Sequence, residues 1–517
     1  MSAPLKDKLC TADEAVALIQ DDQTVLTGGF VGAGHPEALS AAIERRFLQT
    51  GKPRGLALAY AAGQGDGKTR GVNHFGHEGL LKRVIGGHWG LAPRVGRLAM
   101  DGLIEAYNFP QGVMCQLFRD IAAGRPGCIT HIGLDTFVDP AIQGGRLNES
   151  TPSGMVERIE LDGRIWLWYK SFPVDVGLIR GTAADPLGNI VMDKEPLFGE
   201  VLAIAQAAHN HGGLVIAQVE NLLDGLGQPQ TVKVPGVLVD RVVVAEPHEH
   251  EQTFAESYNP GYCMARPAGE SEACWSPLPL DHRRIIAARA CEEIPRGAIV
   301  NLGIGIPEGI AVIAAERGLL DEFTLTVESG PIGGIPAGGL SFGAALYPHC
   351  VVDQPAQFDF YDGGGLDFAA LGAAQIDARG NVNVSRFGAK LAGVGGFVNI
   401  SQTAKRLVFC GTFTSGGLQV EVEDGRLRVV NEGKVRKFVA EVEQLSFSAG
   451  RSLRLGQEVL YVTERAVFRL VEHGVELIEV APGIDAREQV LQQMDFKPIV
   501  RSVRTMADHL FRWTGVE

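Results

Sequence analysis

Two patterns occur twice in this chain, in the same order, and this repetition constrains the fold more than any other feature. The pattern G-x-G-x-P-E stands at 32–37 and again at 303–308. Residues 174–190 then align without a gap with residues 366–382, with two aspartates, a glycine and an asparagine at matching positions. The order of the matches indicates an internal duplication, with an insertion in the first copy. The chain is therefore predicted to contain two copies of one fold.

Strands and helices alternate in both copies. In the first, Thr11 and Glu14 form a capping-box pattern ahead of a helix. Apolar runs then predict strands over 24–27, 56–61 and 213–219 and a helix over 202–208. The run 174–190 is predicted to be a buried strand that closes in a turn at Asp185, Pro186 and Gly188. In the second copy Asp281 is expected to cap a helix, and a strand follows at 298–300. This alternation predicts an α/β fold in which each copy has a largely parallel sheet covered by helices.

The last part of the chain is richer in strand patterns. Asp424-Gly425 stands between alternating apolar residues, as in a hairpin. Segments 459–462, 466–470 and 475–480 continue as a meander, and a closing helix is expected over 487–494. A β-rich addition therefore completes the second copy.

The predicted boundaries are an N-terminal domain over 1–245, a linker over 246–280 and a C-terminal domain over 281–517. The middle segment is polar and interrupted by proline and glycine. His248 and His250 in this segment are expected to be solvated linker side chains and not metal ligands.

The formal net charge is −14, with acidic and basic residues intermixed. This charge pattern argues against nucleic-acid binding, which needs clustered Lys and Arg. The N-terminus lacks the apolar core of a signal peptide, and no membrane-spanning apolar run is present. The eight cysteines are scattered without a C-x-x-C pair, so we expect reduced thiols in a cytoplasmic protein. A homo-oligomer, dimer or tetramer, is expected because symmetric assemblies are common.

Glu328 is the main candidate for chemistry. It ends an alternating strand pattern at 323–327 and is followed by a turn rich in glycine and proline, 329–336. Aliphatic neighbours could leave this carboxylate poorly solvated and hence nucleophilic. The alternative is a solvent-exposed Glu at a strand end.

Three further segments of the second copy would share an edge with Glu328 if the sheet is doubly wound: 301–307, the segment after Asp359, and 388–396. The pattern G-x-G-x-P-E is not a dinucleotide fingerprint, because Glu stands where the last glycine is required. Its glycines either offer free N–H groups to an oxyanion or simply form a tight turn. Residues 62–69 resemble a phosphate-binding loop only loosely, and Gln111 is expected to carry a loop amide.

Several of these segments together resemble the family I CoA-transferases. The matching motifs are NLGIGIP at 301–307, ESG at 328–330, GVGG at 393–396, GGHWG at 86–90, Pro110-Gln111-Gly112 and the first G-x-G-x-P-E loop. The resemblance covers nearly the whole chain. The residue pattern of 459–499, with VLYVTERAVFRL, APGID and MDFKPIV, is most similar to that of the acetate/propionate CoA-transferase branch.

The resemblance implies two tandem CoA-transferase domains and a nucleophilic Glu328 that forms a glutamyl–CoA thioester in ping-pong exchange of CoA. The donor is a short-chain acyl-CoA and the acceptor a free carboxylate. Coenzyme A is then a substrate, and no permanently bound cofactor or metal is required. The expected oxyanion donors and lining residues are Gln111, Asn301, Gly303, Gly305, Gly395 and Gly396.

One position departs from the related 3-oxoacid transferases, which carry Asn within the first P-E-N loop where this chain has Ala38. A side-chain contact from that loop is therefore in doubt, and 3-oxoacid specificity is not favoured. Two other functions stay open: an acyl-CoA hydrolase on the same scaffold, and a non-catalytic sensor of acyl-CoA or sugar phosphate.

Overall fold

The computed structural model describes residues 4–267 and 277–512. The chain forms two compact units. Unit 1 comprises Met1–Arg266, Val327–Phe360 and Ala389–Asn399, and unit 2 comprises Pro267–Thr326, Tyr361–Gly388 and Ile400–Glu517. Two segments that are late in the sequence, including the one with Glu328, therefore belong to the unit built mainly from the N-terminal half.

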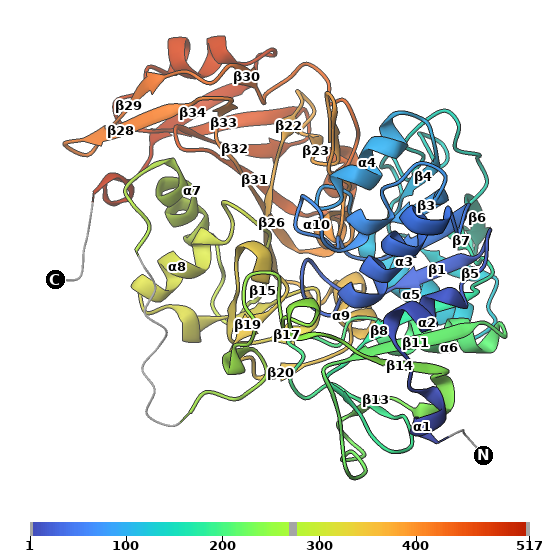
Figure 1. Ribbon diagram of the computed structural model, residues 1–517. Helices are drawn as coiled ribbons and strands as arrows, with labels where there is room; N and C mark the ends of the chain where they lie inside the picture. The colour runs from blue at the N-terminus through green and yellow to red at the C-terminus, as the bar shows by residue number, and fades with distance from the viewer. Residues whose placement is uncertain (1–3, 268–276, 513–517) are drawn as a thin grey trace. The chain divides into compact units, whose positions relative to one another are not determined.

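Unit 1 is built on a seven-stranded sheet in the order β14-β11-β8-β1-β2-β3-β4, and every neighbouring pair is parallel (Figure 1). The strands are β1 (Thr24–Thr27), β2 (Leu56–Tyr60), β3 (Leu81–Gly86), β4 (Glu105–Asn108), β8 (Val176–Arg180), β11 (Leu214–Val219) and β14 (Arg241–Val244). The helices used below are α2 (Ala12–Ala17), α3 (Glu37–Thr50), α4 (Pro93–Met100), α5 (Gln111–Ala122), α6 (Val201–Asn210) and α9 (Gln354–Phe360).

Helices cover both faces of this sheet. In β8, Val176 and Leu178 belong to the apolar core that includes residues of α2 and α3. The intervening Gly177 lies against Ile204 and Ala208 of α6. Since alternate residues of a strand point to opposite faces, the two sets of helices lie on opposite sides of β8. The predicted parallel sheet covered by helices is confirmed.

The capping box is also confirmed, with Thr11 and Glu14 bonding each other's backbone amides at the start of α2. Part of the predicted linker differs from expectation. Residues 247–266 belong to unit 1, and His250 is buried, 3.4 Å from a carboxylate oxygen of Glu195. The expectation of a solvated His250 was wrong, because packing buries side chains that a polar, aperiodic sequence leaves unassigned; His248 is exposed as expected.

Within unit 2 the strand order is β16-β15-β21-β26-β31-β32-β33-β34. The first five strands run parallel, and β32 and β33 continue antiparallel, which confirms the predicted meander. The strands are β15 (Ile299–Leu302), β16 (Thr324–Thr326), β21 (Phe368–Gly372), β26 (Arg406–Cys410), β31 (Glu458–Val462), β32 (Ala466–Val471), β33 (Gly474–Val480) and β34 (Ile499–Thr505), with helices α7 (His282–Cys291) and α8 (Gly309–Glu316).

The C-terminal addition contains the predicted hairpin, β28 (Gln419–Glu423) and β29 (Arg426–Asn431), with Asp424-Gly425 as its turn (Figure 1). The closing helix over 487–494 was wrong as a regular helix. The chain there forms one wide turn over Ala486–Val490 and a 3₁₀ turn over Leu491–Gln493. A helix of only two turns gains too few hydrogen bonds to hold regular geometry by itself.

The duplicated sequence gives duplicated local structure. Asp185 in unit 1 accepts hydrogen bonds from the amides of Leu187 and Asn189 and from the Asn189 side chain. Asp377 in unit 2 accepts the corresponding bonds from residues 379 and 381. The other matching pair of aspartates, at 175 and 367, each accept from the amide at the start of the neighbouring strand. The division into two homologous sequence domains with boundaries at 245 and 281 stays a prediction.

Candidate active site

Glu328 lies in unit 1, two residues after the end of β16, and its exposed fraction is 7%. The turn that follows is closed by backbone hydrogen bonds, from Val327 N to Pro331 O at 2.9 Å and from Gly330 N to Val327 O at 3.0 Å. The Ser329 hydroxyl donates to the carbonyl of Gly343. The alternative of a solvent-exposed Glu at a strand end was therefore wrong, because this turn folds the carboxylate inward.

Gly330 is required by the geometry of this turn. Its φ is +131°, a region that side chains disfavour. A Cβ atom there would lie 2.1 Å from the carbonyl oxygen of Val352, whose own amide donates to Gly330 O at 3.0 Å. The Glu328 turn thus packs directly against the backbone at Val352, so its conformation is held from outside as well as from within.

Gln111 is the first residue of α5, and its exposed fraction is only 2%. The expectation of a loop amide was wrong, because Pro110 begins a helix here. The Gln111 amide nitrogen donates to the carbonyl of Gly395 at 2.9 Å. Within the described chain the side-chain nitrogen Nε2 has no hydrogen-bond partner. Gly395 has a φ of +52°, and Gly396 beside it is buried. Three of the predicted site residues thus lie together.

His88 belongs to the same group, and reasoning from sequence did not single it out. Its side chain lies beside Gly63, Gly90 and Gly395. Burial lowers the pKa of His88 to about 4, with a smaller contribution from the charge of Lys390. Its Nδ1 has no hydrogen-bond partner among the residues that the structure covers. The only sequence signal was its position between a glycine pair and Trp89 in GGHWG. A neutral imidazole therefore stands beside Gly395.

The other three predicted site residues belong to unit 2. Asn301 is buried in β15, and its side chain donates to the carbonyl of Thr326 at 3.4 Å. Gly303 donates from its amide to Ala370 O at 2.8 Å, and Gly305 has a φ of +90°. The loop after β15 is therefore a glycine turn, and the role of its N–H groups toward an oxyanion stays a prediction.

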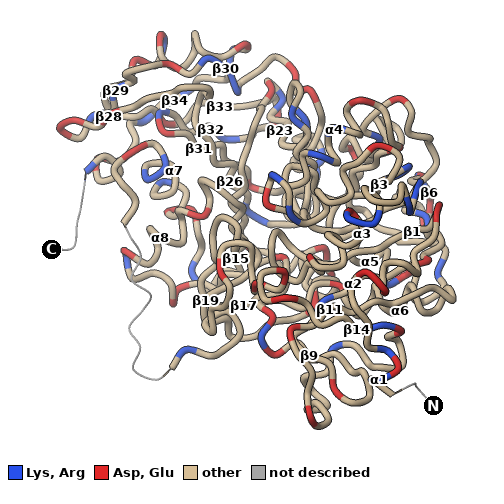
Figure 2. The backbone as a smooth tube through the Cα atoms, in the orientation of Figure 1, with Lys and Arg blue, Asp and Glu red and all other residues tan. Residues whose placement is uncertain are grey.

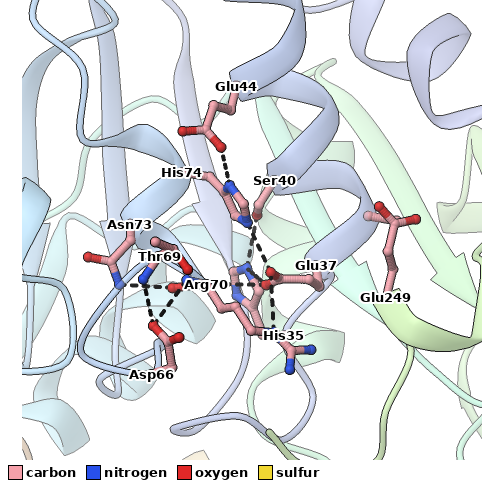
Figure 3. Close-up of polar contacts among 12 residues, drawn as sticks. His35, Glu37, Ser40, Glu44, Asp66, Thr69, Arg70, Asn73, His74 and Glu249 are labelled. Carbon is pink, nitrogen blue, oxygen red and sulfur yellow. Dashed lines mark hydrogen bonds and ion pairs between the residues drawn. The ribbon is translucent and has the colours of Figure 1, made fainter.

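The first G-x-G-x-P-E loop ends in a buried ionic network (Figure 3). Glu37 accepts from His74 Nε2 at 2.9 Å and from the Gly71 amide at 2.9 Å, and Glu44 bonds His74 Nδ1. Burial by itself would raise the pKa of Glu37, but the bonds and charges of the histidines lower it to about 2. His74 is correspondingly raised to a pKa of about 9 against the effect of burial. This loop is therefore anchored by a buried ion pair.

Ala38, where related 3-oxoacid transferases carry Asn, is buried, and its amide donates to Gln218 Oε1 at 2.9 Å. Figure 2 shows acidic and basic residues interspersed along the chain. Among the described residues, no group of three His, Cys, Asp or Glu side chains is placed to hold a metal ion. The helices in the described ranges include none that is long and apolar enough to cross a membrane.

Comparison with known proteins places this geometry in a family. Residues 10–245 match the family model described as coenzyme A transferase. The chain is 42% identical over 505 residues to acetate CoA-transferase YdiF of Escherichia coli K12, covering 97% of this chain and 94% of that protein. It is also 42% identical over 522 residues to caffeate CoA-transferase of Acetobacterium woodii, covering 99% of both chains.

The crystal structure of the acyl-CoA transferase YdiF of E. coli O157:H7, a thioester complex with CoA, superposes with a TM-score of 0.92. The two proteins are 40% identical, and the match covers 99% of this chain and 98% of that one. Similarity of this extent, in sequence and in fold, shows that the chain belongs to the coenzyme A transferases, in the branch that contains acetate CoA-transferase.

Proposed function

We propose that this transferase exchanges CoA between short-chain acyl-CoA thioesters and free carboxylates through a covalent thioester on Glu328. The observation that carries the proposal is the burial of Glu328 on a closed turn. A carboxylate with little exposure to water is poorly solvated, which raises its nucleophilicity and protects a reactive acyl intermediate from hydrolysis.

Two displacements at carbonyl carbon make the intermediate. A Glu328 carboxylate oxygen attacks the thioester carbonyl, the C–S bond breaks, and CoA leaves as a thiolate from an acyl–glutamyl anhydride. The thiolate then attacks the Glu328 carbonyl carbon, the C–O bond breaks, and the acyl group departs as a free carboxylate. An incoming carboxylate reverses both steps. No proton is transferred in the net reaction.

Each displacement passes through a tetrahedral oxyanion, which needs hydrogen-bond donors. Gln111 Nε2 is buried and unpaired in the described chain, which supports its assignment as one donor. The backbone around Gly395 and Gly396 is proposed as a second source. Because the Gly395 amide already donates to the carbonyl of Gly87 at 2.8 Å, the donor there is proposed to be the Gly396 amide, with Gly395 leaving room for close approach. Asn301, Gly303 and Gly305 are proposed to line the site by their match to the family motifs.

Other properties are proposals of the same standing. Coenzyme A would act only as a substrate, with no permanently bound cofactor. The mixed charges and scattered cysteines support a cytoplasmic protein that does not bind nucleic acid. A homo-oligomer is proposed because closed symmetric assemblies dominate among soluble oligomers.

Peptide mass spectrometry after brief mixing with acetyl-CoA, without an acceptor acid, tests the proposal. Trypsin releases residues 318–379 as one peptide, which contains Glu328 and also Glu322 and the exposed Cys350. A phosphine reductant removes any CoA disulfide with Cys350. The Glu322→Gln variant should keep the adduct and Glu328→Gln should lose it.

The adduct should be discharged by acetate or propionate with regeneration of a thioester. No adduct, with free thiol accumulating, would favour the hydrolase. No adduct and no turnover with any short acyl-CoA would favour a binding module. Normal turnover by Glu328→Gln would show that the nucleophile is a different residue.

A further inference from the structure

Three buried side chains of unit 1 that carry a carboxyl or amide group have no hydrogen-bond partner for any of their polar atoms in the described structure. They are Glu200, Gln354 and Gln357, with exposed fractions of 1%, 0% and 1%. Both carboxylate oxygens of Glu200 and both amide atoms of each glutamine are unpaired. Buried polar groups are nearly always hydrogen-bonded, because an unpaired one costs about 1–3 kcal/mol. Three together point to a partner that the described residues do not supply.

The three side chains come from adjoining elements. The Gln354 amide, at the start of α9, donates to the carbonyl of Gly199 at 2.9 Å, and Glu200 is the residue that precedes α6. Gln354 and Gln357 are three residues apart in α9 and therefore lie on the same side of that helix. The unpaired groups thus gather where α6 and α9 begin.

This cluster is tied to the Glu328 turn through the backbone. Gly330, two residues after Glu328, bonds the amide of Val352 at 3.0 Å, and Val352 stands two residues before Gln354. The chain from Val352 to Gln354 therefore connects the two directly, with Gly330 packed against Val352 O as described above.

Glu200 is uncharged at neutral pH. Burial raises the pKa of Glu200 to about 8, and only its own backbone amide opposes the effect. None of the charged residues near α6 contributes to this shift of the Glu200 pKa. On the elements packed against α6, on α9 and just before α9, these residues are Arg119, Asp120, Arg180, Lys233, Asp353 and Asp359. As a carboxylic acid, Glu200 offers one O–H donor, and each glutamine offers an NH₂ group.

We propose that Glu200, Gln354 and Gln357 form the subsite that binds the free carboxylate substrate. Three neutral donors match the two acceptor oxygens of a small carboxylate without a cation. Neutral donors hold an anion more weakly than an ion pair does, which suits a group that must both enter and leave in each cycle. This inference rests on the proposed exchange reaction and assigns residues to its acid partner.

Acetate binding is measured in the Glu328→Gln background, where no chemistry occurs, by titration of ¹³C-labelled acetate followed by NMR. Replacing Glu200 or Gln354 by Leu should weaken acetate binding at least ~10-fold, the effect of losing a hydrogen bond to a charged group. Glu200→Gln keeps a neutral donor and should stay within about threefold of the parent. The matched control is Gln218→Leu, because Gln218 is a buried amide already paired to Ala38 and Glu249; it should leave acetate affinity unchanged.

The pH dependence supplies a readout that a merely structural role would not give. Acetate affinity of the parent should fall as the pH rises through about 8, since ionised Glu200 repels a second carboxylate, and Glu200→Gln should show no such fall. Equal affinities for the parent and both Leu variants, or an identical pH profile for parent and Glu200→Gln, would overturn the assignment. Because binding is measured without turnover, that failure leaves the role of Glu328 untouched.

Discussion

The ion pair between His74 and Glu37 makes the stability of unit 1 depend on pH in a direction that can be calculated. His74 is enclosed by Glu37 and Glu44, with 13% of its side chain exposed. Its pKa is about 9 in the folded chain, against 6.5 for an ordinary histidine. A raised pKa means that the folded state holds the proton more tightly, so this interaction stabilises the protein at low pH and is lost as the pH rises.

The magnitude follows from the two pKa values. At pH 7 the folded His74 is protonated and the unfolded one is mostly neutral, which gives about 2.5 kcal/mol in favour of folding. At pH 9.5 both states are largely neutral and the contribution falls below ~0.2 kcal/mol. Glu37 and His74 share one ion pair, so this free energy is counted once. For a chain of 517 residues the loss corresponds to roughly 2 °C in Tm.

Thermal unfolding at a fixed scan rate, at pH 7 and pH 9.5, measures the effect. Other groups also titrate in this range, so the test compares the pH-dependent Tm change of the parent with that of His74→Gln. The variant should lose about 2 °C less than the parent between the two pH values. His248→Gln, at an exposed histidine, should behave as the parent. If the parent and His74→Gln lose equal amounts, the ion pair does not stabilise the fold.

Two further substitutions test packing and buried charge. Gly330→Ala should lower both Tm and kcat, because its Cβ would clash with a carbonyl oxygen and add about 2–3 kcal/mol of strain to the folded state. Gly212→Ala, also at positive φ but in open space, should lower the free energy of unfolding by only about 1 kcal/mol. A wild-type kcat for Gly330→Ala would show that the turn adapts. Arg465→Met should lower the free energy of unfolding by about 3–5 kcal/mol, because it leaves the buried carboxylate of Glu464 without its ion-pair partner. Arg428→Met, at a surface ion pair, should change it by less than about 1 kcal/mol. Denaturant unfolding measures both effects. Equal effects at the two arginines would contradict the assignment of a buried ion pair.

The elements that the sequence predicted well are those set by local pattern. The strand at Thr24–Thr27, the helix after Asp281 and the hairpin at Asp424-Gly425 each carry a cap, a turn dipeptide or an apolar period that works over a few residues. The turns around Asp185 and Asp377 repeat bond for bond, because the same short stretch of residues supplies all the donors and acceptors.

The predictions that were wrong share a different cause. Gln111 was expected on a loop and His250 in solvent. Gln111 instead begins a helix, and both side chains are buried, because segments distant in sequence cover them. Residues 389–399 supply the carbonyl beside Gln111, and no local rule connects positions so far apart. His88 was overlooked for the same reason, since a single histidine between a glycine pair and Trp89 carries no periodic signal.

The sequence by itself determined the duplication, the α/β class with its parallel sheets, the family and the choice of Glu328, because each depends on residue order along short stretches. Only the tertiary structure decided which residues lie around Glu328 and in the rest of its unit. It assigned Val327–Phe360 and Ala389–Asn399 to the unit built mainly from the N-terminal half. It also buried Glu200, Gln354 and Gln357 where none of the residues it describes offers them a hydrogen bond. Burial and pKa are properties of neighbours in space, and residues that are remote along the chain supply most of those neighbours.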